Sequence, residues 1–249
     1  MGLVLRSKNT ETTNILCEDN LLRTKLIYLK PLCFPYSNTR KIFRFFSEKS
    51  HAIDFMDGKI RLSTLSTCRS YEDSLQGDSG EGIENRHIDY LNITSENSDK
   101  VNQVIGNFIS IEGCGSALFE NCTFTNQIDD AFVLCFTNSF KDDDLTKNFG
   151  KYCVEITNSL DLFYKISKEI NNQFTINQGV MGKITYADRN LKNLNPANGP
   201  LGFVKPKDPY EPQNELRMLW HINTKELPLT PKFIKIPSIQ KHCRLTIHD

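Results

Sequence analysis

A short stretch near the C-terminal end of the chain carries the residues whose types and spacing best suit chemistry. It runs from Lys205 to Ile222 as KPKDPYEPQNELRMLWHI, so a proline-stiffened loop leads into an apolar strand. Because strand side chains alternate between faces, we expect Gln213, Glu215, Arg217 and Leu219 in one row. A carboxylate at the head of a strand is well placed to stabilise positive charge on a substrate. The alternative is that Glu215 and Arg217 form an ordinary solvated pair.

An arginine among aromatic residues is the second candidate. Arg44 lies in the run Ile42–Phe46, IFRFF, which predicts a core strand. An arginine with such neighbours must either extend its charged end to solvent or hold an anion. Its planar guanidinium suits bidentate binding of phosphate groups. The sequence therefore predicts either a surface role or an anion-binding role for Arg44.

Hydroxyl residues end the next predicted strand. The run KIRLSTLSTCR, residues 59–69, alternates between apolar and polar residues and then carries Ser63, Thr64, Ser66 and Thr67. These side chains can donate hydrogen bonds to phosphate or sugar oxygens, although hydroxyl residues at a strand end are also ordinary turn residues. Both interpretations stay open at this point.

The elements that must position these residues are short and unevenly interleaved. Strand patterns cover residues 42–46, 59–65, 89–93, 131–137, 152–156, 179–187, 233–237 and 244–247, and helical patterns cover 48–56, 95–111 and 160–170. Many short strands with about three helices predict an α+β fold with mixed or largely antiparallel sheets. The continuous apolar run 131–137 is typical of the middle of a sheet. We expect residues 1–20 to form an N-terminal arm and residues 21–249 a single catalytic domain.

Two charged stretches are predicted to lie in solvent. Residues 70–85 are acidic and glycine-rich, which indicates a loop. Its acidic residues Asp78, Glu81 and Glu84 lack the ligand order of a calcium loop, so we predict a solvated loop and no metal site. The run 141–147, KDDDLTK, is predicted to form an exposed turn.

Composition excludes several classes of protein. The 249 residues include 30 basic and 30 acidic ones, so the chain has no overall attraction for nucleic acid or anionic membranes, and any polyanion site must be local. The eight cysteines form no C-x-x-C pair, which favours a reducing, cytoplasmic compartment. No apolar stretch is long enough to span a membrane. Glycine-rich nucleotide-binding motifs and the G-x-S-x-G and H-E-x-x-H motifs do not occur.

The order of these residues resembles that of the arginine–serine–glutamate branch of the ADP-ribosyltransferase family. Arg44 lies on a first predicted strand, and Ser63 and Thr64 lie on a second. A Gln-x-Glu motif, Gln213 and Glu215, follows a late loop. The resemblance implies that fold, with NAD as a substrate. It implies that Arg44 holds the NAD phosphates and that Ser63 and Thr64 support the nicotinamide ribose pocket. Glu215 would be the catalytic carboxylate and Gln213 the residue on the acceptor side.

The resemblance also implies a substrate class. Phe46 and Tyr71 would form an apolar or stacking wall for nicotinamide, with core packing as the alternative role for such aromatic residues. Glutamine at position 213 points away from arginine acceptors, so the acceptor is expected to be RNA, DNA or protein, as in a toxin or anti-phage effector that an antitoxin or inhibitor protein would control. Cleavage of the nicotinamide–ribose bond develops oxocarbenium character, which a carboxylate can stabilise. An NAD glycohydrolase and a non-catalytic binding module on the same scaffold are the alternatives.

Overall fold

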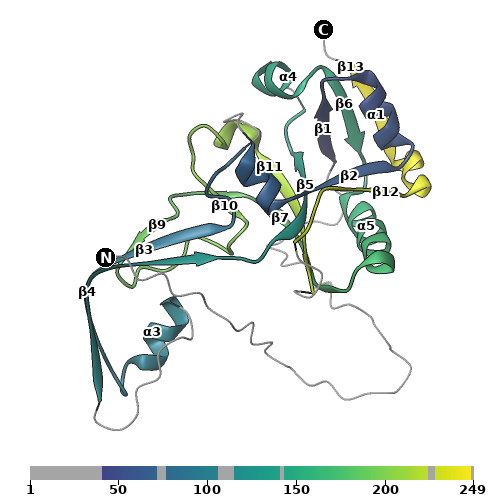
Figure 1. Ribbon diagram of the computed structural model, residues 1–249. Helices are drawn as coiled ribbons and strands as arrows, with labels where there is room; N and C mark the ends of the chain where they lie inside the picture. The colour runs from purple at the N-terminus through teal and green to yellow at the C-terminus, as the bar shows by residue number, and fades with distance from the viewer. Residues whose placement is uncertain (1–40, 72–76, 106–114, 141–142, 224–227, 248–249) are drawn as a thin grey trace, which may run out of the picture.

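The computed structural model describes residues 41–71, 77–105, 115–140, 143–223 and 228–247 (Figure 1). The strands are β1 (Ile42–Phe46), β2 (Lys59–Thr64), β3 (Ile83–Thr94), β4 (Ser116–Gln127), β5 (Ala131–Thr137), β6 (Tyr152–Ile156), β7 (Ile176–Lys183), β8 (Thr185–Tyr186), β9 (Asn190–Lys192), β10 (Val204–Lys205), β11 (Glu215–Ile222), β12 (Lys232–Lys235) and β13 (Cys243–Ile247). The helices are α1 (Lys49–Met56), α2 (Leu65–Ser70), α3 (Ser98–Ile105), α4 (Asp143–Phe149) and α5 (Ser159–Gln173), with short 3-10 turns η1 (Glu211–Gln213) and η3 (Pro237–His242). The predicted α+β class is confirmed. Among these helices, none has the length and apolar character needed to cross a membrane.

Strand β5 is the centre of the main sheet. It pairs along its whole length with β11, which pairs in turn with β7. The other edge of β5 is shared by two strands, β2 near its start and β1 at its end. The sheet continues from β2 to β12 and from β1 through β6 to β13, and all these pairings are antiparallel. The apolar run 131–137 is therefore in the middle of a sheet, as predicted.

One face of this sheet packs against α1 and α5 and forms the main core. The side chains of Leu216, Met218 and Trp220 on β11 all lie in it. Trp220 is fully buried, stacks on Phe163 of α5 with ring centroids 5.5 Å apart, and donates a hydrogen bond from its indole N–H to Ser167 Oγ at 2.8 Å. A buried indole N–H needs such a partner.

The other face of the sheet carries the polar row. Side chains alternate along β11, so Glu215, Arg217 and Leu219 project away from the main core, as predicted. A smaller apolar cluster lies on this side and includes Val133, Leu219 and Phe203. The polar row therefore lies under a second layer of the protein rather than in solvent.

A second, smaller sheet extends from the body of the molecule. The long strands β3 and β4 form an antiparallel ribbon, β9 adds to β3 in parallel, and α3 lies near the outer end of the ribbon (Figure 1). Ile88, Ile93, Val101 and Ile105 make a separate small core there. The ribbon begins at Ile83, two residues after Glu81, and so helps to fix the position of Glu81.

Some local predictions were wrong. The helix predicted from residue 48 begins one residue later, because Glu48 is the N-cap of α1, and the Glu48 side chain makes no capping hydrogen bond. The predicted exposed turn at residues 141–147 is largely the helix α4. Residues 65–70, expected to end a strand, form α2, because the Thr64 side chain accepts a hydrogen bond from the Thr67 N–H and so caps a helix. The predicted arm, residues 1–20, lies outside the described residues.

Candidate functional site

A gap in the pairing of β5 is the centre of the candidate site. On the edge of β5 opposite β11, Ser63 of β2 pairs with Val133, and Phe43 of β1 pairs with Thr137. Cys135 lies between these two positions. Its carbonyl accepts a hydrogen bond from Nη1 of Arg44 instead of from a neighbouring strand. The guanidinium of Arg44 therefore occupies the gap between β1 and β2.

Arg44 has an unusual environment for a cation. Its guanidinium carbon lies 5.6 Å from the ring centre of Phe46 and 5.8 Å from that of Phe136. Across the ranges that the structure describes, no carboxylate lies within ion-pair distance of it. Burial lowers the pKa of Arg44, which means that the environment disfavours its charge. An anion bound at this guanidinium would compensate the unpaired charge.

Glu215 begins β11, opposite Thr137, and is 4% exposed. Its Oε1 accepts from Arg217 Nε at 2.7 Å, and its Oε2 lies 2.9 Å from Lys205 Nζ. Its backbone N–H donates to the Tyr186 hydroxyl at 2.7 Å. Burial alone would raise the pKa of Glu215, but Arg217 and Lys205 outweigh it and hold that pKa well below its usual range. Glu215 is therefore a carboxylate anion at any physiological pH.

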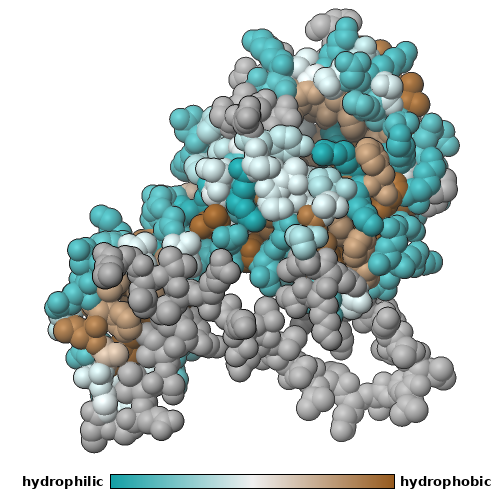
Figure 2. Space-filling view, viewed as in Figure 1, coloured by the Kyte–Doolittle hydropathy of each residue, from teal (hydrophilic) through white to brown (hydrophobic). Residues whose placement is uncertain are grey.

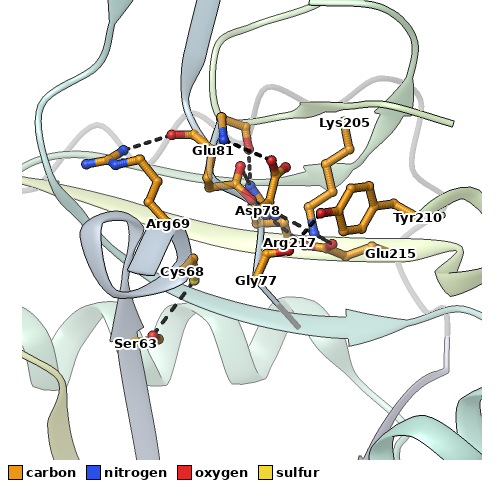
Figure 3. A network of polar contacts seen from close by, with 12 residues as sticks. Ser63, Cys68, Arg69, Gly77, Asp78, Glu81, Lys205, Tyr210, Glu215 and Arg217 are labelled. Carbon is orange, nitrogen blue, oxygen red and sulfur yellow. Dashed lines mark hydrogen bonds and ion pairs between the residues drawn. The ribbon is translucent and has the colours of Figure 1, made fainter. Parts of the chain in front are cut away.

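The ion pairs continue beyond Glu215 into a buried network (Figure 3). Arg217 forms a bidentate ion pair with Glu81, with Nη1 at 2.5 Å from Oε1 and Nη2 at 3.0 Å from Oε2. Its Nη1 also donates a hydrogen bond to the Gly202 carbonyl at 2.7 Å. Lys205 Nζ lies 3.9 Å from Glu81 Oε2 and 4.8 Å from the ring centre of Tyr210. Two carboxylates and two cations balance within the network formed by Glu81, Lys205, Glu215 and Arg217.

The acidic residues of the loop at 70–85 are buried, which corrects the prediction that they are solvated. Asp78, Glu81 and Glu84 are 5%, 1% and 8% exposed. Each has an arginine partner: Arg189 is 2.7 Å from Asp78, Arg217 grips Glu81, and Arg86 is 3.4 Å from Glu84. Burial of these carboxylates is tolerated because each is paired. In the described residues, no group of His, Cys, Asp and Glu side chains is arranged to hold a metal ion.

Gln213 does not share a strand face with Glu215, contrary to the prediction. It ends the 3-10 turn η1, and Asn214 between the two residues has a left-handed backbone with φ of 42°. The Asn214 side chain donates to Ser139 Oγ at 2.9 Å, and its carbonyl accepts from Asn138 Nδ2 at 2.9 Å. These contacts fix the break between the loop and β11. The alternation that holds from Glu215 onward therefore does not extend back to Gln213.

Of the other predicted site residues, Ser63 shares the sheet face of Glu215, whereas Thr64 and Tyr71 make local contacts of their own. Ser63 lies on the same sheet face as Glu215, since it pairs with Val133, which pairs with Leu219. Thr64 is buried and caps α2, so the structure gives it a local role. Tyr71 is 40% exposed, and its hydroxyl accepts from Arg61 at 3.3 Å.

The relation of Arg44 to Glu215 follows from the register. Phe43 and Glu215 both pair with Thr137, so the Arg44 side chain leaves its strand toward the opposite face and turns into the gap to reach the Cys135 carbonyl. The two charged residues thus lie on either side of one strand, β5, rather than on distant surfaces. Phe46 follows Arg44 on the same face, and its ring lies beside the guanidinium.

The chain matches no protein-family model, no curated protein and no solved structure.

Proposed function

We propose that the protein transfers ADP-ribose from NAD to a macromolecular acceptor, at the gap in the pairing of β5. One observation carries the proposal. A guanidinium without a carboxylate partner among the described residues lies in that gap, and a carboxylate held in its anionic form lies on the next strand across β5. NAD needs both groups, because its pyrophosphate is a double anion and its ribose becomes cationic as nicotinamide leaves.

The two residues have separate tasks in this proposal. The guanidinium of Arg44 binds the pyrophosphate with two parallel hydrogen bonds and gains the anion that its surroundings lack. Glu215 stabilises the ribosyl cation electrostatically and is not a general acid, since its pKa is held low. Because Glu215 is almost fully buried, one of its two cation partners must move away from the carboxylate before the ribose can contact it. Lys205 has a flexible side chain and can move more easily than Arg217, which donates four hydrogen bonds.

The test is a comparison of Glu215→Gln with the wild-type protein. Each is incubated with labelled NAD and separate pools of protein, RNA and DNA, and nicotinamide release and label transfer are measured. We expect Glu215→Gln to lose both by at least about 100-fold, because a neutral amide lacks the charge that stabilises the cation. Glu155→Gln on β6, where the carboxylate pairs with Lys41 at 2.8 Å, is the matched control and should keep activity. Full activity in Glu215→Gln, or no NAD turnover by the wild type, refutes the proposal.

The pairing of Glu215 favours a second candidate, a non-catalytic binding module. Both of its oxygens already have a cation partner, as a purely structural network would require. In that case the protein binds NAD without releasing nicotinamide. Calorimetric titration with NAD, beside the turnover assay, separates the two functions. Release of nicotinamide without labelling of any pool would instead indicate an NAD glycohydrolase.

A further inference from the structure

The exposed edge of the main sheet carries cations and an aromatic ring on one face. Lys59 and Arg61 are exposed and alternate with buried residues along β2. On β12, Lys235 pairs directly with Lys59, and Phe233 pairs directly with Arg61. Directly opposed residues in an antiparallel pair project from the same face. The four side chains therefore form one patch.

Positive charge exceeds negative charge in this patch. Lys59 Nζ bonds to Asp54 at 2.8 Å, but Arg61 and Lys235 lie within ion-pair distance of no carboxylate that the described part of the chain contains. Arg61 donates a hydrogen bond to the uncharged Tyr71 hydroxyl, at 3.3 Å. Like charges that face each other across a strand pair are destabilising. The opposed pair Lys59 and Lys235 therefore favours binding of an anion.

Two aromatic rings are exposed beside these cations. Phe233 is 61% exposed and Tyr71 is 40% exposed. The Phe233 ring centre lies 5.3 Å from Lys59 Nζ. Figure 2 shows apolar side chains, in brown, among hydrophilic ones, in teal, over the lobe where Figure 1 places β2 and β12. Exposed aromatic rings beside cations suit a partner that offers flat rings for stacking and negative charge for the cations.

We propose that the basic-aromatic face, formed by Lys59, Arg61, Tyr71, Phe233 and Lys235, binds a single-stranded nucleic acid. Bases stack on the exposed rings while phosphates lie against the cations, which is how sequence-tolerant single-strand sites work. A duplex would hide its bases from Phe233. An acidic peptide would satisfy the cations but give the rings no stacking partner. The chain as a whole has no net charge, so the positive charge of this face is a local feature and does not reflect the overall composition.

The basic-aromatic face leads toward the gap in β5. Lys59, Arg61 and Ser63 follow one another on the same face of β2, and Ser63 pairs with β5 beside the gap. Phe233 lies opposite Arg61, two residues before Ser63, and two residues of β-strand span about 7 Å. A nucleic acid bound at Phe233 would thus reach Ser63, beside the gap in β5. The nucleic acid would then be the acceptor of ADP-ribose. That last step rests on the proposed function, whereas the binding itself does not.

Fluorescence polarisation with a labelled 12-nucleotide single-stranded RNA, in the absence of NAD, tests the binding. We expect Phe233→Ser to weaken it about tenfold through loss of stacking. Tyr90→Ser is the matched control, because Tyr90 is 62% exposed on β3, and it should leave the affinity unchanged. Equal affinities for the two variants overturn the stacking role, and no binding by the wild type at 100 mM salt overturns the proposal.

The salt dependence of binding gives a second, independent readout. Arg61→Gln and Lys235→Gln should each reduce the slope of log affinity against log salt by about 0.7, the value for one phosphate contact in a single strand. Arg244→Gln, at an exposed position on β13, should not. A duplex that binds as tightly as the single strand, or an acidic peptide that binds equally in wild type and Phe233→Ser, overturns the proposal. Failure of NAD turnover would refute the proposed function but leave this result standing.

Discussion

Replacing Arg217 with leucine removes the guanidinium that is hydrogen-bonded to both buried carboxylates of the network. Of the cations in the described residues, Lys205 alone would then lie within ion-pair distance, at 3.9 Å from Glu81, which is 1% exposed, and at 2.9 Å from Glu215. Removing one partner of a buried ion pair costs about 3–5 kcal/mol. For a domain of this size that corresponds to a fall in melting temperature of roughly 6–20 °C. Urea and thermal denaturation of both proteins would measure it.

The pH dependence of this cost identifies its cause. In the wild type the folded-state pKa of Glu215 is depressed, so its stabilisation is present above the unfolded value near 4.5 and is lost as the pH falls. In Arg217→Leu, Glu215 loses one of the two cations that offset its burial, so its folded pKa rises and less of this stabilisation remains at neutral pH. The gap between the two proteins should therefore widen from acid to neutral pH.

A matched control and a refuting result complete the test. Lys41→Gln removes a cation that is itself 62% exposed and pairs with Glu155 at 2.8 Å, and it should cost about 0–1 kcal/mol. If Arg217→Leu costs no more than this control and its cost is constant with pH, the network behaves as solvated surface charge. The account of Glu215 as an anion held by its neighbours would then be wrong.

Two further predictions concern the proposed reaction. Arg44→Lys should weaken NAD binding about tenfold with little change in melting temperature, since the charge remains and the planar fork is lost; calorimetric titration and a thermal melt measure both, Arg244→Lys is the control, and unchanged affinity counts against an anchoring role. Gln213→Ala should lose transfer but keep slow NAD hydrolysis, because Gln213 is proposed to act only on the acceptor; nicotinamide release with and without acceptor tests this, and equal losses would contradict it.

Local patterns predicted the strands that are apolar and bounded by turns. Ile42–Phe46, Ala131–Thr137 and Tyr152–Ile156 have the predicted bounds, because each is a short run of strand-forming residues. Strand β4, in contrast, has no buried residue along its length, so its sequence shows no buried row. It is a strand because β3 pairs with it, which a single-sequence pattern does not reveal.

The candidate site was predictable only in part for a similar reason. The row of Glu215 and Arg217 follows from strand alternation. The partner of Arg217, however, is Glu81, which lies 136 residues earlier in a glycine-rich loop. Composition makes such a loop look solvated, and only the fold brings an arginine to it. The one sequence signal for a buried role of this loop is that several acidic residues recur in it while the chain as a whole has no net charge.

The shared edge of β5 has a consequence for how the chain is made. The partners of β5 come from residues near 43, 63 and 215, so on a ribosome two of them precede it and β11 follows 77 residues later, after residues 138–214. At 5–20 residues per second that interval lasts roughly 4–15 s. During it the run AFVLCFT has one bare edge, and a short apolar strand with an open edge is prone to pair with other chains. Rapid translation of residues 138–214, or a chaperone that covers β5 until β11 emerges, would therefore raise the yield of native protein.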